Sequence, residues 1–246
     1  EIFIDMESYR GTVMLRHGFT KRLELGADLP YMAQEAGVFD SAINGWHDLF
    51  GFPDGGRAKQ SEDTYRFFYR RNGQDVFRIS QPARGTGDLL LSAGIGLLPD
   101  SKPAHKSLSL RVSATLPTIN SNDLLASNNS TFSVNLHFNE EHVGGGQHWA
   151  WFSGLGGMYL GDSELLADLR RDWVARAIFG MGWYAQPSVI LKAQVQLHTP
   201  YYSHSRIRQL TATAGLLVFG GTFMLKKEYQ LDIGLGEDIF VRTVPD

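Results

Sequence analysis

Apolar and polar residues alternate with a period of two along most of this chain. Successive side chains of a β-strand point to opposite faces, so each alternating stretch predicts a strand with one apolar and one polar face. The pattern is clear at 22–29, 88–97, 107–116, 132–139, 189–198, 209–218 and 229–236. Weaker alternation at 8–17 and 174–184, and a Trp- and Gly-rich stretch around 148–160, bring the expected number of strands to ten.

The length of the alternating stretches favours a membrane barrel over a soluble β-domain. A strand of about ten residues, tilted by ~45°, spans ~25 Å of hydrocarbon, whereas soluble strands usually have about five or six residues. In 209–218 we expect the apolar face to carry Leu210, Ala212, Ala214, Leu216 and Val218. Aromatic residues cluster near the strand ends, as in the interfacial girdles of membrane barrels. These are Tyr9, Phe19, Tyr31, Trp149, Trp183, Tyr184, Tyr201, Tyr202, Phe219 and Phe223.

Connections of two lengths alternate along the chain. Short ones are expected near 18–21, 99–105, 141–147, 185–187 and 220–227. Longer ones are expected at 31–84, 118–129, 161–173 and 199–207. Outer-membrane barrels sort their connections in this way, into short periplasmic turns and long extracellular loops. We therefore predict one all-β domain over 1–246, a transmembrane antiparallel up-and-down β-barrel in a bacterial outer membrane, with 31–84 outside the cell.

The sequence of the longest connection, 31–84, predicts secondary structure within it. Phe39, Ile43, Trp46, Leu49 and Phe50 recur at helical spacing in 38–50, and Asp40 or Ser41 is placed to cap such a helix. Asn72-Gly73, between two apolar stretches, predicts a β-hairpin. We expect the helix and the hairpin to stand over the barrel mouth.

Composition excludes several other classes. The net charge is −3, so no basic excess points to nucleic acid. Cysteine is absent, which excludes a disulfide scaffold. A run of about 18 apolar residues, as a transmembrane helix requires, is also absent. The chain opens on Glu1 without an initiator Met, and we take it to be processed or trimmed.

The loop sequence from His47 to Arg57, HDLFGFPDGGR, resembles the signature of an uncharacterised family, domain of unknown function 3187. Shorter similarities occur at 87–89, 191–194 and 237–238. The resemblance implies a Gram-negative outer-membrane barrel and lends no activity. It also implies one strand before and one after those present here, so that twelve strands are favoured and closure with ten is the alternative.

The polar faces of the predicted strands supply the candidate lumen residues. They are Arg10, Arg16, Glu24, Asp28, Asp88, Arg111, His137, Arg176, Lys192 and Asp232. Charged groups in a narrow lumen either line an aqueous path for a polar solute or pair with one another and fill the barrel. The pattern leaves both alternatives open.

A second group of candidates belongs to the mouth or its lid: Trp46, His47, Asp48 and Arg57. They form either a binding or catalytic cluster or a loop that packs Trp46 down as a lid. Glu140, Glu141, His142 and His148 have metal-ligand side chains, but their place in an exposed turn does not favour a metal site. A nucleophile motif of the form G-x-S-x-G is absent, and no catalytic residue is assigned.

We expect a small channel or transporter for a polar or amphipathic small molecule, capped or gated by 31–84. One alternative is an outer-membrane enzyme acting on lipid or a surface substrate, with His47 and Asp48 as participants. Another is a structural or partner-binding barrel with a filled lumen. The expected partners are outer-membrane lipid, lipopolysaccharide and a small-molecule solute; no cofactor or nucleic acid is expected.

Overall fold

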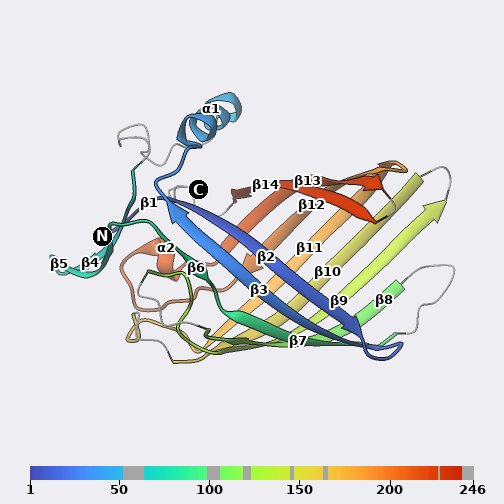
Figure 1. Cartoon of the computed structure of the whole chain (residues 1–246), viewed down its shortest axis with the longest axis horizontal. Helices are drawn as coiled ribbons and strands as arrows, with labels where there is room; N and C mark the ends of the chain where they lie inside the picture. Colours follow the sequence, from blue (N-terminus) through green and yellow to red (C-terminus); the bar gives the residue numbers. More distant parts are fainter. Residues whose placement is uncertain are drawn as a thin grey trace.

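A computed structural model describes residues 1–51, 64–98, 106–118, 123–144, 147–162, 166–226 and 228–239. Its main feature is an 11-stranded antiparallel sheet in which each long strand pairs with the next along the chain (Figure 1). In order these are β2 (Glu7–Gly18), β3 (Leu23–Glu35), β7 (Leu89–Gly96), β8 (Lys106–Leu116), β9 (Thr131–Gly144), β10 (Gln147–Leu160), β11 (Trp173–Gln186), β12 (Val189–His198), β13 (Ala214–Lys226) and β14 (Tyr229–Asp238). The eleventh strand, β6 (Ala83–Thr86), pairs only with β3. The predicted ten long strands are confirmed.

The two ends of the sheet differ as the connection lengths predict. The helix α1 (Asp40–Phe50) and the strands β1 (Ile2–Asp5), β4 (Arg66–Arg71) and β5 (Gln74–Ile79) gather at one end, which we call the loop end (Figure 1). Short connections join the strands at the other end, the turn end. Several strands outrun their predicted stretches, most of all β3, which reaches Glu35, β9, which reaches Gly144, and β13, which reaches Lys226. The predicted short gaps at 141–147 and 220–227 are therefore mostly strand.

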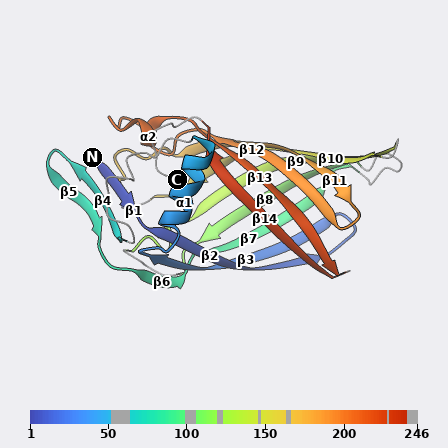
Figure 2. The same ribbon diagram turned by 90° about the horizontal axis from the view of Figure 1, so that it is seen from above.

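The sheet curls without closing. Strands β2 and β14 form its two edges, and among the described residues no backbone pairing joins them (Figure 2). The helix α1 lies beside these edges at the loop end, where Trp46 Nε1 donates to Glu237 Oε1 of β14 at 2.9 Å. The backbone N–H of Phe39 donates to Glu7 Oε1 of β2 at 2.7 Å. The segment Phe39–Trp46 thus links both edge strands.

The register divides the sheet into two faces, because directly paired residues point the same way. Predicted apolar residues share the outer face, for example Ala93 with Val112 and Leu25. The prediction for 209–218 is wrong. Gln194 pairs with Val218 and Val195 with Leu217, so Leu217 and Phe219 face outward. The run Leu216-Leu217-Val218-Phe219 is apolar at every position, so alternation cannot decide its facing. Strand β13 begins only at Ala214, after the short helix α2 (Arg208–Thr211).

Large apolar side chains cover the outer face and remain exposed. Eight of them on β10 to β14 are 38–67% exposed: Leu155, Phe179, Leu191, Phe219, Phe223, Leu231, Ile233 and Leu235. A contiguous apolar surface of this kind marks a face that meets another apolar phase.

Aromatic pairs lie at both ends of this belt. Trp149 stacks on Trp183 at 5.7 Å between centroids near the turn end, and Tyr159 contacts Trp173 at 5.3 Å near the loop end. Ten residues of β10 separate them, which at ~3.3 Å per residue and ~45° tilt gives ~23 Å, the height of a lipid-facing band.

A small three-stranded sheet, β1-β4-β5, stands at the loop end. Its β4–β5 turn is the predicted Asn72-Gly73, with both residues at positive φ, 52° and 81°. Phe68, Tyr69 and Ile79 are buried in it. The pairing of β1 with β4 was not predicted, since four residues show too little alternation. In α1 the N-cap is Phe39 rather than Asp40 or Ser41, and no side chain caps the helix. No helix in the described part of the chain is long and apolar enough to cross a membrane.

Candidate functional site: a charged inner face

The inner face brings together nine of the ten predicted lumen residues. Each pairs across the sheet with an inward-facing partner, as Arg16 does with Gly26 and Lys192 with Gly182 and Gly220. The set is Arg10, Arg16, Glu24, Asp28, Arg111, His137, Arg176, Lys192 and Asp232. Period-two alternation predicted the face of these residues because every second residue of a strand points to the same face of the sheet.

Three of the polar contacts on this face pass over an intervening strand. Arg111 of β8 donates from Nη2 to Glu24 Oε1 of β3 at 2.6 Å, and from Nη1 to Ser92 Oγ at 3.1 Å. Strand β7, which carries Ser92, lies between β8 and β3. It contributes Gly94, which pairs with both Glu24 and Arg111. A Cβ at Gly94 would lie 3.1 Å from the guanidinium. The missing side chain therefore leaves the space through which the ion pair forms.

The same arrangement recurs on the other strands. Arg176 of β11 donates to Asn135 Oδ1 of β9 at 3.3 Å, over Gly156 of β10. Lys192 of β12 donates to Asp232 Oδ1 of β14 at 2.8 Å, beside Gly220 of β13.

On neighbouring strands, Arg16 Nη2 donates to Asp28 Oδ2 at 3.0 Å. Arg10 hydrogen-bonds only to Thr12 of its own strand among the described residues, at 3.3 Å. The glycines on the inner face act as notches that let long polar side chains span the sheet.

These paired charges remain accessible to water. The side chains of Arg111 and Glu24 are 33% and 41% exposed, and those of Lys192 and Asp232 are 43% and 50% exposed. The ion pairs lie along the sheet, between strands two apart, rather than in a dry core. Ion pairs of this exposure contribute little stability, so their arrangement serves mainly to line the face with fixed dipoles and charge.

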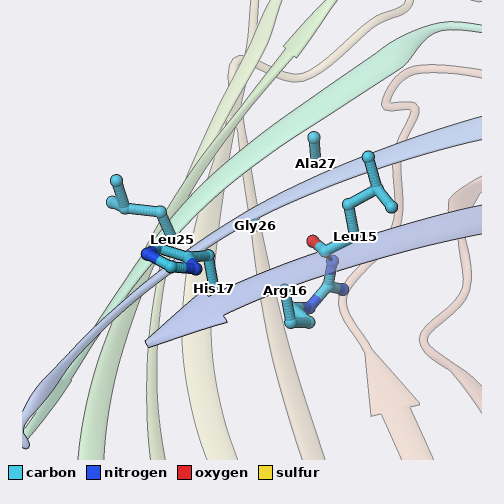
Figure 3. A pocket seen from close by; sticks show the side chains of 6 residues that line it. All are labelled: Leu15, Arg16, His17, Leu25, Gly26 and Ala27. Carbon is cyan, nitrogen blue, oxygen red and sulfur yellow. Dashed lines mark hydrogen bonds between the residues drawn. The ribbon is translucent and has the colours of Figure 1, made fainter. Parts of the chain in front are cut away.

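A hollow of about 250 Å³ lies on β2 and β3 near the turn end (Figure 3). It is lined by Leu15, Arg16, His17, Leu25, Gly26 and Ala27. Leu15 and His17 belong to the outer face and Arg16 to the inner face, so the hollow lies at the unpaired edge of the sheet. Its lining comes from β2 and β3 alone, and it is too open to enclose a ligand site.

A second segment, residues 123–130, packs on the inner face at the loop end. Its Leu124 carbonyl accepts from Gln34 Nε2 of β3 at 3.3 Å, and Ser127 N donates to Asp88 Oδ2 at 2.7 Å. Leu125 and Ala126 are 7% and 8% exposed. This segment covers the inner face at the mouth.

Two further observations show how this segment is held. Tyr65 donates from its hydroxyl to Gln34 Oε1 at 2.9 Å, and burial raises the pKa of Tyr65, so the hydroxyl keeps its proton. Leu124 and Asn128 have left-handed φ of 57° and 55°, a conformation that persists in such residues where surrounding contacts fix it. Asp88, whose Oδ2 accepts the hydrogen bond from Ser127 N, anchors the segment 123–130 rather than lining the lumen.

The three predicted mouth residues that the structure describes point in different directions. Trp46 is hydrogen-bonded to Glu237 of β14. His47 is buried whereas Asp48 is exposed, because successive helical residues point about 100° apart. Arg57 lies outside the described residues. The helix is thus anchored to β14 through Trp46. The side chains of His47 and Asp48 point in different directions, so they are not placed to act on one substrate together.

The turn-end residues with metal-ligand side chains are occupied by other contacts. His148 hydrogen-bonds Glu141 and stacks on Tyr184 with centroids 3.5 Å apart. Glu140 pairs with Lys106 at 3.0 Å. Within the described ranges, no group of three or more His, Cys, Asp or Glu side chains could hold a metal ion.

Several contacts of the site were not predicted. Asn135, Ser92 and the Ser113–Ser133 hydrogen bond of 2.7 Å belong to polar faces that alternation does identify. They were missed because only charged side chains were selected. The segment 123–130 has no periodic signal, so its place at the mouth follows from tertiary contacts alone.

Comparison with known proteins agrees with this architecture. A family model described as "Protein of unknown function (DUF3187)" matches residues 1–246. The structure is similar to that of the COG4313 outer membrane channel from Pseudomonas putida F1, with a TM-score of 0.59, 16% identity, and coverage of 95% of this chain and 77% of that one. This likeness establishes the predicted fold class, an antiparallel up-and-down sheet of the kind that outer-membrane β-barrels use.

A second solved structure is less similar. It is the toluene transporter TodX of Pseudomonas putida, with a TM-score of 0.44, 11% identity, and coverage of 94% of this chain and 63% of that one. Among curated proteins, none matches this sequence.

Proposed function

The chain belongs to the DUF3187 family of proteins of unknown function, and from that premise we propose that it is an outer-membrane channel for small polar or amphipathic molecules. The observation that carries the proposal is that one sheet has two faces of opposite character. An exposed apolar belt covers the outside, and water-accessible charged side chains line the inside.

The outer face supports placement in the outer membrane. Its apolar residues continue from strand to strand and end at Trp149–Trp183 and Tyr159–Trp173, about 23 Å apart. In water such a surface would drive aggregation. With this placement, the loop end faces outside the cell, as the long connections of outer-membrane barrels do.

The inner face supports passage of a solute rather than a filled interior. Its ion pairs lie flat along the sheet, over the notches at Gly94 and Gly156, instead of reaching across the interior. Side chains held against the wall leave the axis of the barrel to water. Outer-membrane lipid and lipopolysaccharide are the surroundings that this placement implies.

Two elements at the loop end control entry in this proposal. The helix α1 within 31–84 is held at the edge strands through Trp46 and Phe39. Residues 123–130 cover the inner face below it, anchored to Asp88 and Gln34. The gate is thus formed by two segments, of which only the first was expected from the sequence.

Planar-bilayer conductance of the purified protein tests this function. We expect discrete channel openings, and we expect Trp46→Phe to increase the open fraction several-fold, because it removes the N–H donated to Glu237 while keeping an aromatic side chain. Deletion of 38–51 should have a larger effect in the same direction.

Trp151→Phe is the matched control, since Trp151 lies on the outer face and contacts Phe179 at 5.8 Å. It should leave the open fraction unchanged. A folded protein without any conductance, before and after the deletion, would reject the channel and favour the filled barrel.

A further inference from the structure

A hollow of about 140 Å³ lies at the loop end between β12 and β13. One wall is the segment that leaves β12, and the other is α2 with the start of β13. The lining residues are His198, Pro200, Tyr201, Tyr202, Gln209, Leu210, Ala212 and Ala214. His198 pairs with Ala214. Like Gln194 and Gln196, which precede it at every second position of β12, His198 points to the inner face. The hollow therefore adjoins the entrance to the polar lining.

Backbone hydrogen bonds fix the first wall. Arg171 N donates to the Tyr201 carbonyl at 2.9 Å, and Ser203 N donates to the Leu169 carbonyl at 2.6 Å. Between them, Arg170 and Tyr202 form a β-bridge. The aromatic residues are thus carried on an ordered segment, and the site is formed before a ligand arrives, as small-molecule sites usually are.

The lining is uncharged and partly aromatic. None of its eight residues is Asp, Glu, Lys or Arg. The neighbouring cation Arg176 pairs with His198 on the inner face, but its guanidinium reaches over β10 to Asn135 of β9, away from β12. A charged ligand would therefore lose hydration without gaining an ion pair from the lining. Tyr201 meets the His198 ring edge-on, with centroids 4.9 Å apart. Burial raises the pKa of Tyr202, so its hydroxyl remains neutral. The lining favours a neutral ligand with a flat apolar body.

His198 supplies one specific polar group. Its Nδ1 lies 2.9 Å from the Thr199 carbonyl oxygen, which can only accept a hydrogen bond. Nδ1 therefore carries the proton in the neutral ring, and Nε2 is left with a lone pair. Within the described residues, no partner for Nε2 is found. A ligand hydroxyl can donate to it.

The volume of the hollow matches a ligand of one ring. An apolar cavity of about 150 Å³ in another protein holds benzene, whereas pockets for drug-sized ligands begin at about 300 Å³. The hollow of about 140 Å³ is of the first kind.

We propose that this hollow binds a neutral monocyclic aromatic alcohol of the phenol class. Its ring lies among Tyr201, Tyr202 and Leu210, and its hydroxyl donates to Nε2 of His198. The proposal rests on the proposed function and deepens it, because it names the solute that docks at the entrance of the channel. From His198 the inner face of β12 continues with Gln196 and Gln194, whose amides can accept the hydroxyl next.

Fluorine NMR of the full chain in lipid nanodiscs tests the site, with 4-fluorophenol as the probe and 4-fluorotoluene as the analogue without the hydroxyl. We expect saturable binding of the phenol and binding of the toluene about tenfold weaker, because the toluene offers Nε2 of the half-buried His198 no hydrogen-bond donor. Equal affinities, or no saturable binding of either probe above empty nanodiscs, would overturn the proposal.

Two variants locate the binding. His198→Ala should bring the two probes to equal affinity, which a general loosening of the fold would not do. Leu210→Trp should abolish binding of both by filling the hollow while leaving His198 in place. The control His17→Ala, on the outer face of β2, should leave the tenfold preference intact. Unchanged binding in Leu210→Trp would exclude this hollow. Conductance is measured separately, so loss of binding with intact channel openings rejects this site alone.

Discussion

Replacing Leu155 with arginine should lower the free energy of unfolding in lipid vesicles by about 2–4 kcal/mol. Leu155 lies on the outer face of β10, midway between Trp149 and Tyr159, and is 67% exposed. If this face meets lipid, a cation at that depth has no water or counter-charge to replace its hydration. Urea-dependent folding into vesicles, followed by tryptophan fluorescence, measures the loss.

The matched control is Gln194→Arg on the inner face of β12. A cation there remains in water, and we expect a change below about 1 kcal/mol, as for surface substitutions generally. Similar losses for the two variants would mean that the outer face does not contact lipid, and the membrane placement would be wrong.

Gly156→Ala should lower the free energy of unfolding by about 1–3 kcal/mol, the usual range for forcing atoms into packed structure. A Cβ at Gly156 would lie 2.5 Å from the Val134 carbonyl oxygen and would also collide with the Asn135 side chain. It would displace the hydrogen bond from Arg176 to Asn135 that passes over this notch. The same vesicle-folding measurement applies.

The neighbouring glycine provides the control. Gly157 faces outward, and a Cβ there would meet no atom within 4 Å. Gly157→Ala should be neutral or slightly stabilising, because glycine loses more backbone freedom than alanine on folding. If both substitutions have the same effect, the inner glycines are not notches and the ion pairs do not depend on them.

Alternation predicted the strands because a strand repeats every two residues wherever one face meets an apolar phase and the other meets water. It therefore also placed nine lumen candidates on one face. It failed at β13, where Leu216 to Phe219 are all apolar and only pairing with β12 decides the facing. Strand ends such as Gly144 and Lys226 were underestimated because alternation fades beyond the apolar belt.

The mouth could be predicted only in part. The hairpin at Asn72-Gly73 follows from turn chemistry, which is local. The contact of Trp46 with Glu237 joins residues far apart in the chain, and no local pattern encodes it. The segment 123–130 and the hollow beside His198 depend likewise on tertiary contacts. The sequence identified which residues are polar and inward, but not which of them meet.

The up-and-down topology also imposes an order of assembly. Four of the nine connections between the long strands are turns of at most four residues, as between β9 and β10, where Gly144 pairs with Gln147, and four more have 9 to 15 residues. The pairing of β3 with β7 is different, since Glu24 meets Gly94 across a loop of about 70 residues, which by loop-closure entropy costs about 1.5–2 kcal/mol more than closing a hairpin of about ten. We therefore expect β7 to β14 to form a contiguous folding unit first. The β2–β3 hairpin, carrying α1 behind it, would then attach as a late and separately reversible step.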